Sequence, residues 1–171
     1  MTQVVLIGPP GAGKSAAGAL LAQTLGTTFR DTDEEVARAA GKAVPDIFLE
    51  DGEDVFRDLE RSAVIRALEE HDGVVAVGSG AILDDAIRVS LKERTVVYLA
   101  ADFTTVAKRA GLDRPRVVLP GNPRGRLRAM LAERAPVYES VATITVQADD
   151  AADAEDLAAQ IAARLGQGTA R

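Results

Sequence analysis

Short apolar runs along the chain alternate with longer segments in which apolar residues recur at helical spacing. The clearest run is Val4-Val5-Leu6-Ile7, and its continuous apolar character is typical of a strand buried on both faces of a parallel sheet. Similar runs predict strands over residues 74–77, 95–99 and 142–146, and a weaker run predicts one over 27–30.

Helices are expected between these runs. Residues 14–25 are rich in Ala and Leu and are followed by Gly26, a residue typical of helix C-terminal caps. Helical patterns also cover 53–70, 102–110, 124–134 and 153–165. Alternating strands and helices predict a three-layer α/β/α fold with a five-stranded parallel sheet. The 171 residues fit one domain.

Residues 111–125 form the most irregular part of the chain, punctuated by Gly and Pro between two predicted helices. We interpret this segment as a mobile lid over a binding site and not as a linker between domains. In parallel sheets, ligands bind beyond the carboxyl ends of the strands. Candidate site residues are therefore expected just after each predicted strand.

The overall charge limits the expected partners. The chain carries 20 Lys and Arg against 26 Asp and Glu, a formal net charge of −6, so neither nucleic acid nor an anionic membrane is an expected partner. An anionic ligand must therefore be held by local positive groups. The absence of Cys excludes disulfides and thiolate metal sites. It also fits a reducing cytoplasm, and the first apolar run is too short for a signal peptide, so we expect a cytoplasmic protein.

A phosphate-binding motif follows the first predicted strand. Residues 8–15 read GPPGAGKS and satisfy G-x-x-x-x-G-K-[ST] in full. The glycines let backbone N–H groups point at a phosphate, and the following helix offers its positive end. Lys14 would reach the β- and γ-phosphates, and the Ser15 hydroxyl would bind Mg²⁺. The motif predicts an ATP site made by Gly11, Ala12, Gly13, Lys14, Ser15 and Ala16.

Two carboxylates follow the second predicted strand, in Arg30-Asp31-Thr32-Asp33. Because side chains alternate along an extended strand, Asp31 and Asp33 are expected to point to the same side of the sheet edge. One could lie near a metal ion and the other near an acceptor hydroxyl. No Asn-Lys-x-Asp element is present, which argues against a GTPase and favours a small-molecule kinase.

Together these motifs resemble the shikimate kinase family, which belongs to the nucleoside-monophosphate-kinase-like P-loop kinases. The resemblance extends in order over residues 4–146, nearly the whole chain. The family usually has three consecutive glycines at positions 78–80, where this chain has a serine in the middle. The resemblance rests on the P-loop, Asp31-Thr32-Asp33, Asp46-Ile47-Phe48, Gly52-Glu53-x-x-Phe56-Arg57-x-x-Glu60, Gly78-Ser79-Gly80-Ala81 and Arg134-Ala135-Pro136-Val137-Tyr138.

The resemblance implies transfer of the γ-phosphoryl group of MgATP to the 3-hydroxyl of shikimate, on the route to chorismate and the aromatic amino acids. It implies that Asp33 takes the proton of that hydroxyl and that Asp31 orients Mg²⁺ through water. Arg57 and Arg134 would bind the shikimate carboxylate, because planar guanidinium groups match carboxylates. The backbone of Gly78, Ser79 and Gly80 would approach the shikimate ring closely.

The lid arginine is assigned by spacing. The family has Arg-Pro-Leu-Leu in the lid, whereas this chain reads RPRVVL over 114–119. The family also places one arginine near the end of the preceding helix and the lid arginine seven positions later. Arg109 ends the predicted helix, so Arg116 is the expected catalytic residue at the phosphates, with Arg109 near the adenine. Arg114 remains the alternative.

Each residue alone also has a simpler interpretation. Asp31 or Asp33 could cap a helix, Arg57 is spaced for surface ion pairs along a helix, and Arg134 could end a helix. Their common place at strand ends beside a P-loop favours the site. A monomeric shikimate kinase is therefore the main prediction, and a gluconate kinase or a non-catalytic nucleotide-binding regulatory protein are the alternatives.

Overall fold

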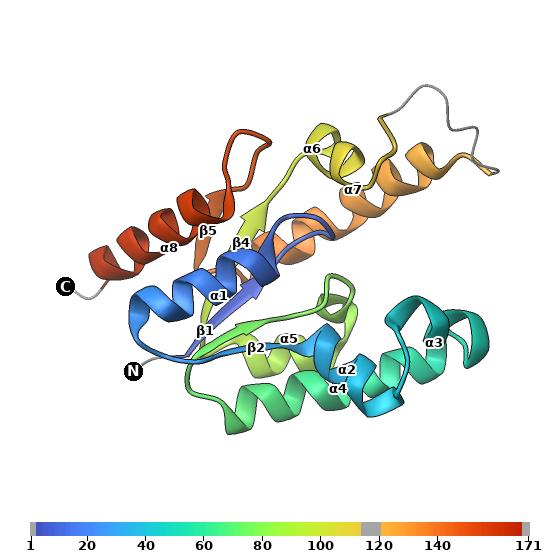
Figure 1. Cartoon of the computed structure of the whole chain (residues 1–171), viewed down its shortest axis with the longest axis horizontal. Helices are drawn as coiled ribbons and strands as arrows, with labels where there is room; N and C mark the ends of the chain where they lie inside the picture. Colours follow the sequence, from blue (N-terminus) through green and yellow to red (C-terminus); the bar gives the residue numbers. More distant parts are fainter. Residues whose placement is uncertain (1–2, 114–120, 169–171) are drawn as a thin grey trace.

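The computed structural model describes residues 3–113 and 121–168. Within them, one parallel sheet has the strand order β2-β3-β1-β4-β5 (Figure 1). This confirms the predicted five-stranded parallel sheet. The strands are β1 (Val4–Ile7), β2 (Phe29–Asp31), β3 (Val74–Ala76), β4 (Thr95–Ala100) and β5 (Ile144–Gln147).

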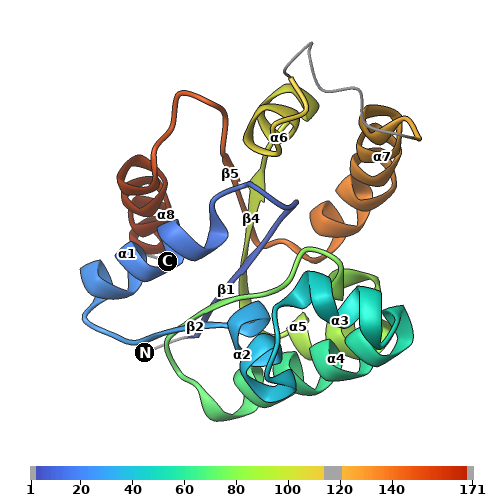
Figure 2. The same cartoon turned by 45° about the vertical axis from the view of Figure 1, so that its right-hand side comes forward.

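Helices cover both faces of the sheet, as Figures 1 and 2 show. No helix in the described ranges is long and apolar enough to span a bilayer. The helices are α1 (Lys14–Leu25), α2 (Thr32–Ala40), α3 (Val44–Glu50), α4 (Glu53–Glu70), the 3-10 turn η1 (Ala81–Leu83), α5 (Asp85–Leu91), α6 (Phe103–Arg109), α7 (Pro123–Val141) and α8 (Ala154–Gly168).

Alternate residues of the strands enter two different cores. In β1, Val4 and Leu6 pack with α1 and α8, whereas Val5 and Ile7 pack with α4, α5 and α7. Each face of the strand is therefore buried, which explains its continuous apolar sequence. A smaller third core around Val36 joins α2 and α3 to α4. These layers confirm the predicted α/β/α architecture.

Three helices, α2, α3 and α5, were not expected from the apolar pattern. The helices α3 and α5 have only seven residues each, which is too short for a periodic pattern to emerge. The helix α2 is rich in charged residues and starts directly at the end of β2. By contrast, α1 and α4 have the predicted boundaries, because their patterns are long.

The prediction that a helix ends near residue 134 was wrong, because α7 continues to Val141 with Pro136 inside it. A proline removes one helical N–H donor but does not stop a helix whose later residues are well packed. Beyond the proline, Tyr138 is buried in the core shared with α4 and α5, and Val137 and Val141 pack against it. Burial of this last stretch favours continuation of the helix.

The segment predicted to be a lid, 111–125, follows α6 and overlaps the first turn of α7, which starts at Pro123. Residues 114–120 fall outside the described residues, and with them Arg114 and Arg116. At its far end, Asn122 caps α7 by accepting a hydrogen bond from the Gly125 N–H at 3.1 Å. The lid assignment therefore stays a prediction.

Candidate functional site

The candidate site lies at the carboxyl edge of the sheet, where β1 ends. The chain adds strands to one side of β1 and then to the other, and such a switch in strand order opens a crevice beyond the strand ends. A cavity of about 420 Å³ is located there. It is lined by Pro10, Gly11, Gly13, Lys14, Ser15, Ala16, Asp31, Asp33, Ala76, Val77 and Ser79.

The loop between β1 and α1 has backbone conformations that require glycine. Gly11 and Gly13 have φ of 77° and 92°, values that side chains other than glycine rarely adopt. A Cβ on Gly8 would lie 2.6 Å from the Leu99 carbonyl oxygen of β4. The side chain of Ala12 is buried in the core, so Ala12 can offer only its backbone to a ligand. The loop therefore wraps around the start of α1, as a phosphate site requires.

The backbone of this loop holds the Lys14 side chain. Its Nζ donates hydrogen bonds to the carbonyl oxygens of Gly8 at 2.8 Å and Pro9 at 3.0 Å. Desolvation lowers the pKa of Lys14 to about 8, although the nearby carboxylates of Asp33 and Asp31 act in the opposite direction. An anionic phosphate beside the amino group would favour its charged form. Lys14 is thus positioned for a polyphosphate.

Ser15 and Asp31 meet at the start of α1, where the Ser15 hydroxyl donates a hydrogen bond to Asp31 Oδ2. The other carboxylate oxygen, Oδ1, caps α2 by accepting from the backbone N–H of Asp33 at 3.0 Å and Glu34 at 3.4 Å. Among the described residues, no group of three or more His, Cys, Asp or Glu could hold a metal ion. A hydroxyl and a carboxylate beside a phosphate loop nevertheless suit Mg²⁺, which takes few protein ligands and keeps several waters.

Asp33 lies in the first turn of α2 and not on an extended strand. The expected alternation of Asp31 and Asp33 was therefore wrong, because the strand ends at Asp31, which serves as the helix cap. Both carboxylates still face the cavity. Desolvation raises the pKa of the Asp33 carboxyl and the charge of Asp31 adds to this, while Lys14 and Arg57 oppose it. A carboxylate with a raised pKa is a better proton acceptor.

The turn after β3, residues 78–80, gives room to three charged side chains. A Cβ on Gly78 would lie 2.6 Å from Asp33 Oδ1 and 2.7 Å from Glu60 Oε1. A Cβ on Gly80 would lie 2.4 Å from Arg57 Nη1. These two glycines therefore let α2 and α4 approach the turn. Within the described ranges only Asn122 combines a side chain with positive φ, so the middle residue of the turn needs no glycine.

Arg57 is presented by α4 and is paired with a buried carboxylate. Its Nη1 donates to Glu60 Oε2 at 2.7 Å, and Glu60 is only 2% exposed. The guanidinium carbon also lies 5.3 Å from the centre of the Phe56 ring. Desolvation raises the pKa of Glu60, and Arg57 opposes this shift. The predicted ion pair between Arg57 and Glu60 is therefore confirmed, but it is not a surface pair, because Glu60 is buried. The pair holds Arg57 against the turn.

Arg134 approaches the same turn from α7. Its Nη1 lies 3.4 Å from Ser79 Oγ, and one helical turn further on the Tyr138 hydroxyl donates to the Ser79 carbonyl oxygen at 2.6 Å. The buried Tyr138 ring is stacked on Tyr98, with centroids 5.1 Å apart. Desolvation lowers the pKa of Lys14 and raises that of Glu60, and the charge of Arg134 adds to the first shift and opposes the second. The two predicted arginines therefore flank one site from opposite helices.

Arg109 lies on the opposite side of the P-loop. It donates hydrogen bonds to the Gly11 carbonyl oxygen and, at 3.3 Å, to the Asp149 carbonyl oxygen after β5. Arg109 therefore lies beside the P-loop, and its role near the adenine stays a prediction. The other arginine predicted there, Arg116, is outside the described residues.

Three supporting residues were missed as site residues by sequence reasoning: Thr32, Glu60 and Tyr138. The Thr32 hydroxyl accepts a hydrogen bond from the Gly78 N–H at 3.1 Å, so this backbone N–H already has a partner. Glu60 holds Arg57, and Tyr138 holds the turn at Ser79. Thr32 and Tyr138 act across large separations in sequence, whereas Glu60 lies three residues from Arg57 on the same helix. The polar character of Glu60 on an otherwise apolar face could have signalled its role.

Comparison with known proteins gives consistent matches. A model of the shikimate kinase family matches residues 10–165. A shikimate kinase of Thermobifida fusca is 55% identical over 146 residues, which cover 85% of each chain. A shikimate kinase of Streptomyces coelicolor is 49% identical over the same shares of the two chains.

The fold comparison agrees. The solved structure of a shikimate kinase from Acinetobacter baumannii in complex with shikimate superimposes with a TM-score of 0.90 at 34% identity. The match covers 100% of this chain and 96% of that one. The architecture of the whole chain is therefore that of a P-loop kinase.

Proposed function

The chain belongs to the shikimate kinase family, and we propose that it transfers the γ-phosphoryl group of MgATP to the 3-hydroxyl of shikimate, giving shikimate 3-phosphate and ADP. One observation carries this proposal. A carboxylate, Asp33, lies between a phosphate loop on one side and two arginines, Arg57 and Arg134, on the other. An acceptor that carries both a carboxylate and a hydroxyl fits this order of charges.

The acceptor would bind over the turn at residues 78–80. Arg57 and Arg134 would share its carboxylate, since guanidinium groups form charge-assisted hydrogen bonds with planar carboxylates. With the carboxylate held there, a ring hydroxyl would reach Asp33, which lies over Gly78 at the same turn. Ser79 contributes a hydroxyl close to Arg134. Its partly buried side chain would reduce the space available to the acceptor.

The nucleotide would occupy the P-loop, with its phosphates on the backbone N–H groups of residues 11–16. Lys14 would leave the carbonyl oxygens of Gly8 and Pro9 and bind the β- and γ-phosphates. Ser15 would bind Mg²⁺ directly and Asp31 through water. When bound, the metal ion neutralises charge on the β- and γ-phosphates.

The chemical step needs only one proton acceptor from the protein. The acceptor hydroxyl oxygen forms a bond to the γ-phosphorus as the bond to the β-phosphate oxygen breaks, and ADP leaves. Asp33 takes the hydroxyl proton. The charge on the transferred group is balanced by Lys14 and, by sequence spacing, by Arg116, with Arg109 beside the adenine. Positioning and charge supply most of the rate.

The alternatives from the sequence account less well for the contacts. A non-catalytic nucleotide-binding protein would not need Asp33 with a raised pKa beside Lys14. A gluconate kinase would also need a carboxylate clamp, so the clamp alone does not separate the two acceptors. We also propose that the protein acts as a monomer. Because the reaction consumes ATP, we expect it to take place in the cytoplasm.

Product analysis tests the proposal. After incubation with MgATP and shikimate, ³¹P NMR should show one new phosphate monoester, and its proton couplings should place it on the 3-hydroxyl. A phosphate at another hydroxyl, or none, would contradict the proposed placement of the acceptor.

Replacing Gly80 by Ala should weaken shikimate binding by at least about tenfold. Gly80 has φ −90°, so alanine fits the backbone, but its Cβ would meet the end of the Arg57 side chain at 2.4 Å. Arg57 can move aside, so folding should survive while the carboxylate clamp is displaced. Calorimetric titration with shikimate measures the effect. Unchanged affinity in a variant with a normal melting temperature would show that Arg57 does not bind the acceptor.

A further inference from the structure

The charges of Lys14 and Arg57 act on the Asp33 carboxylate, but no direct contact with a polar partner among the described residues fixes its direction. The carboxylate forms no hydrogen bond or ion pair with any described residue, although it lies against Gly78. The direction of the carboxylate therefore depends on the first turn of α2, which carries it. A small shift of that turn would move the carboxylate away from the acceptor hydroxyl.

This first turn is fixed at three points. Asp31 caps it and is tied to Ser15. Thr32, fully buried, accepts from the Gly78 N–H. Glu35, two residues after Asp33, is the third point and is only 9% exposed. Asp31 and Thr32 precede Asp33 in the chain, so Glu35 is the anchor on its other side.

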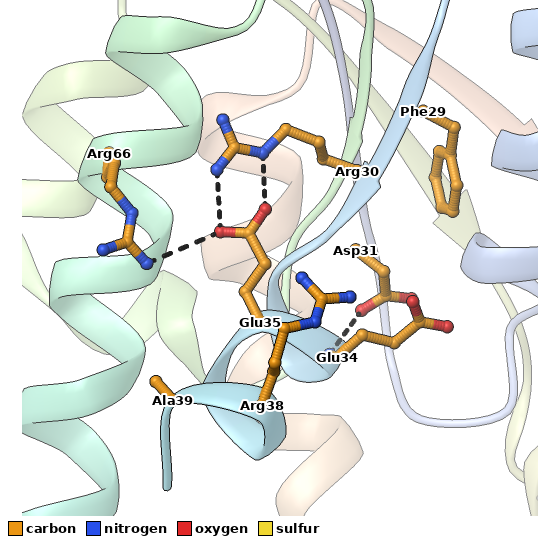
Figure 3. Close-up of a pocket in the computed structure, with 8 residues that line it drawn as sticks. All are labelled: Phe29, Arg30, Asp31, Glu34, Glu35, Arg38, Ala39 and Arg66. Carbon is orange, nitrogen blue, oxygen red and sulfur yellow. Dashed lines mark hydrogen bonds and ion pairs between the residues drawn. The ribbon is translucent and has the colours of Figure 1, made fainter. Parts of the chain in front are cut away.

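Glu35 is bound by arginines from two other elements. Arg30 of β2 holds it with two hydrogen bonds, Nε to Oε1 and Nη2 to Oε2, the second at 3.0 Å. Arg66 of α4 approaches Oε2 at 3.8 Å. Figure 3 shows both guanidinium groups facing the Glu35 carboxylate, Arg30 from β2 and Arg66 from α4. The network therefore joins α2, β2 and α4 through one carboxylate.

The surroundings make this network the main support on that side of α2. A cavity of about 400 Å³ opens there, lined by Phe29, Arg30, Asp31, Glu34, Glu35, Arg38, Ala39 and Arg66 (Figure 3). The opposite side of α2 packs through Val36 into the small core with α3 and α4. On the side of the cavity, α2 is therefore connected to β2 and α4 by the ion pairs of Glu35.

We infer that Glu35, held by Arg30 and Arg66, is a positioning residue that sets the Asp33 carboxylate for proton transfer. It touches neither nucleotide nor acceptor and acts only through Asp33. The inference rests on the proposed role of Asp33 as proton acceptor. It assigns to this charged cluster a function in catalysis beyond holding the fold together.

The test is a double-mutant cycle on kcat between Glu35→Gln and Asp33→Asn. Alone, Glu35→Gln should lower kcat about ten- to a hundredfold, because a displacement on the order of 1 Å of a reacting group can cost about 10²-fold. In the Asp33→Asn background, the same change should lower kcat less than about twofold. A purely structural role of Glu35 would give the same loss in both backgrounds, and that result would overturn the inference.

Two further variants keep the test decisive. Glu70→Gln removes the exposed second partner of Arg30, at 3.5 Å, and should leave kcat unchanged. If Glu35→Gln does not fold, Arg66→Gln, at a half-exposed residue, takes its place in the cycle. Additive losses for Arg66→Gln and Asp33→Asn would also overturn the inference. Near-normal turnover of Asp33→Asn by itself would instead remove the proposed role of Asp33.

Discussion

Replacing Asp33 by Asn is expected to lower kcat by at least about 10²-fold while ATP affinity stays nearly unchanged. Asn keeps the shape of the side chain but cannot accept the proton of the acceptor hydroxyl. Proton transfer to a positioned side chain typically contributes about 10²–10⁴-fold. Steady-state kinetics with varied shikimate, together with nucleotide titration, measures both quantities.

The competing explanation is that Asp33 has only a structural role, and the typical free energy of such an interaction is known. A carboxylate in the first turn of a helix interacts with the helix dipole by about 0.3–1 kcal/mol, and the helix cap itself is Asp31. If Asp33 had only this structural role, its replacement would lower stability slightly and leave turnover intact. Glu34→Gln is the matched control, because Glu34 is the next acidic residue of the same turn. Wild-type kcat in Asp33→Asn would falsify the catalytic role.

Arg57→Ala and Arg134→Ala should each weaken shikimate binding by about 2–5 kcal/mol, which corresponds to about 30- to 5,000-fold in Kd. The loss is large because each change removes one partner of a charge pair from a partly desolvated site. ATP binding should be little affected, since neither arginine lines the P-loop cavity. Calorimetric titration with each ligand separates the two effects.

The two arginines differ in what their loss leaves behind. Arg57→Ala also unpairs the buried Glu60, so its melting temperature should fall. Arg134 contacts the Ser79 and Tyr138 hydroxyls and pairs with no buried carboxylate among the described residues, so its loss should leave stability closer to normal. Arg61→Ala is the control, because Arg61 lies one helical turn after Arg57 and pairs with Asp84. If shikimate affinity stays unchanged in both Arg57→Ala and Arg134→Ala, the proposed acceptor site is wrong.

The parts of the fold that could be predicted are those encoded locally. The P-loop needs its glycines, lysine and serine within eight consecutive residues, and α1 follows with strong helix formers and a glycine cap, so both were predicted with correct boundaries. The continuous apolar runs located the strands, because both faces of this sheet are covered. Here neighbouring residues in sequence decide the structure.

The parts that escaped prediction depend on contacts between distant residues. Asp31 and Asp33 were correctly placed at the cavity, but their geometry was wrong, because α2 starts at Thr32, within the stretch that the alternation assumed to be extended. Tyr138 reaches Ser79, and Arg66 reaches Glu35, across long stretches of chain. The periodic pattern of apolar residues in the sequence does not indicate such pairs. The same applies to Pro136, which local rules treat as a helix end although distant packing keeps it inside α7.

The most direct test of the proposed function is ADP release measured with MgATP and a panel of acceptors. Shikimate should stimulate ADP release far more than gluconate or nucleoside monophosphates do, because only shikimate is expected to place a ring hydroxyl at Asp33 while its carboxylate is held by Arg57 and Arg134. Equal stimulation by gluconate would contradict shikimate as the acceptor, and no stimulation by any acceptor would contradict a catalytic role of the site.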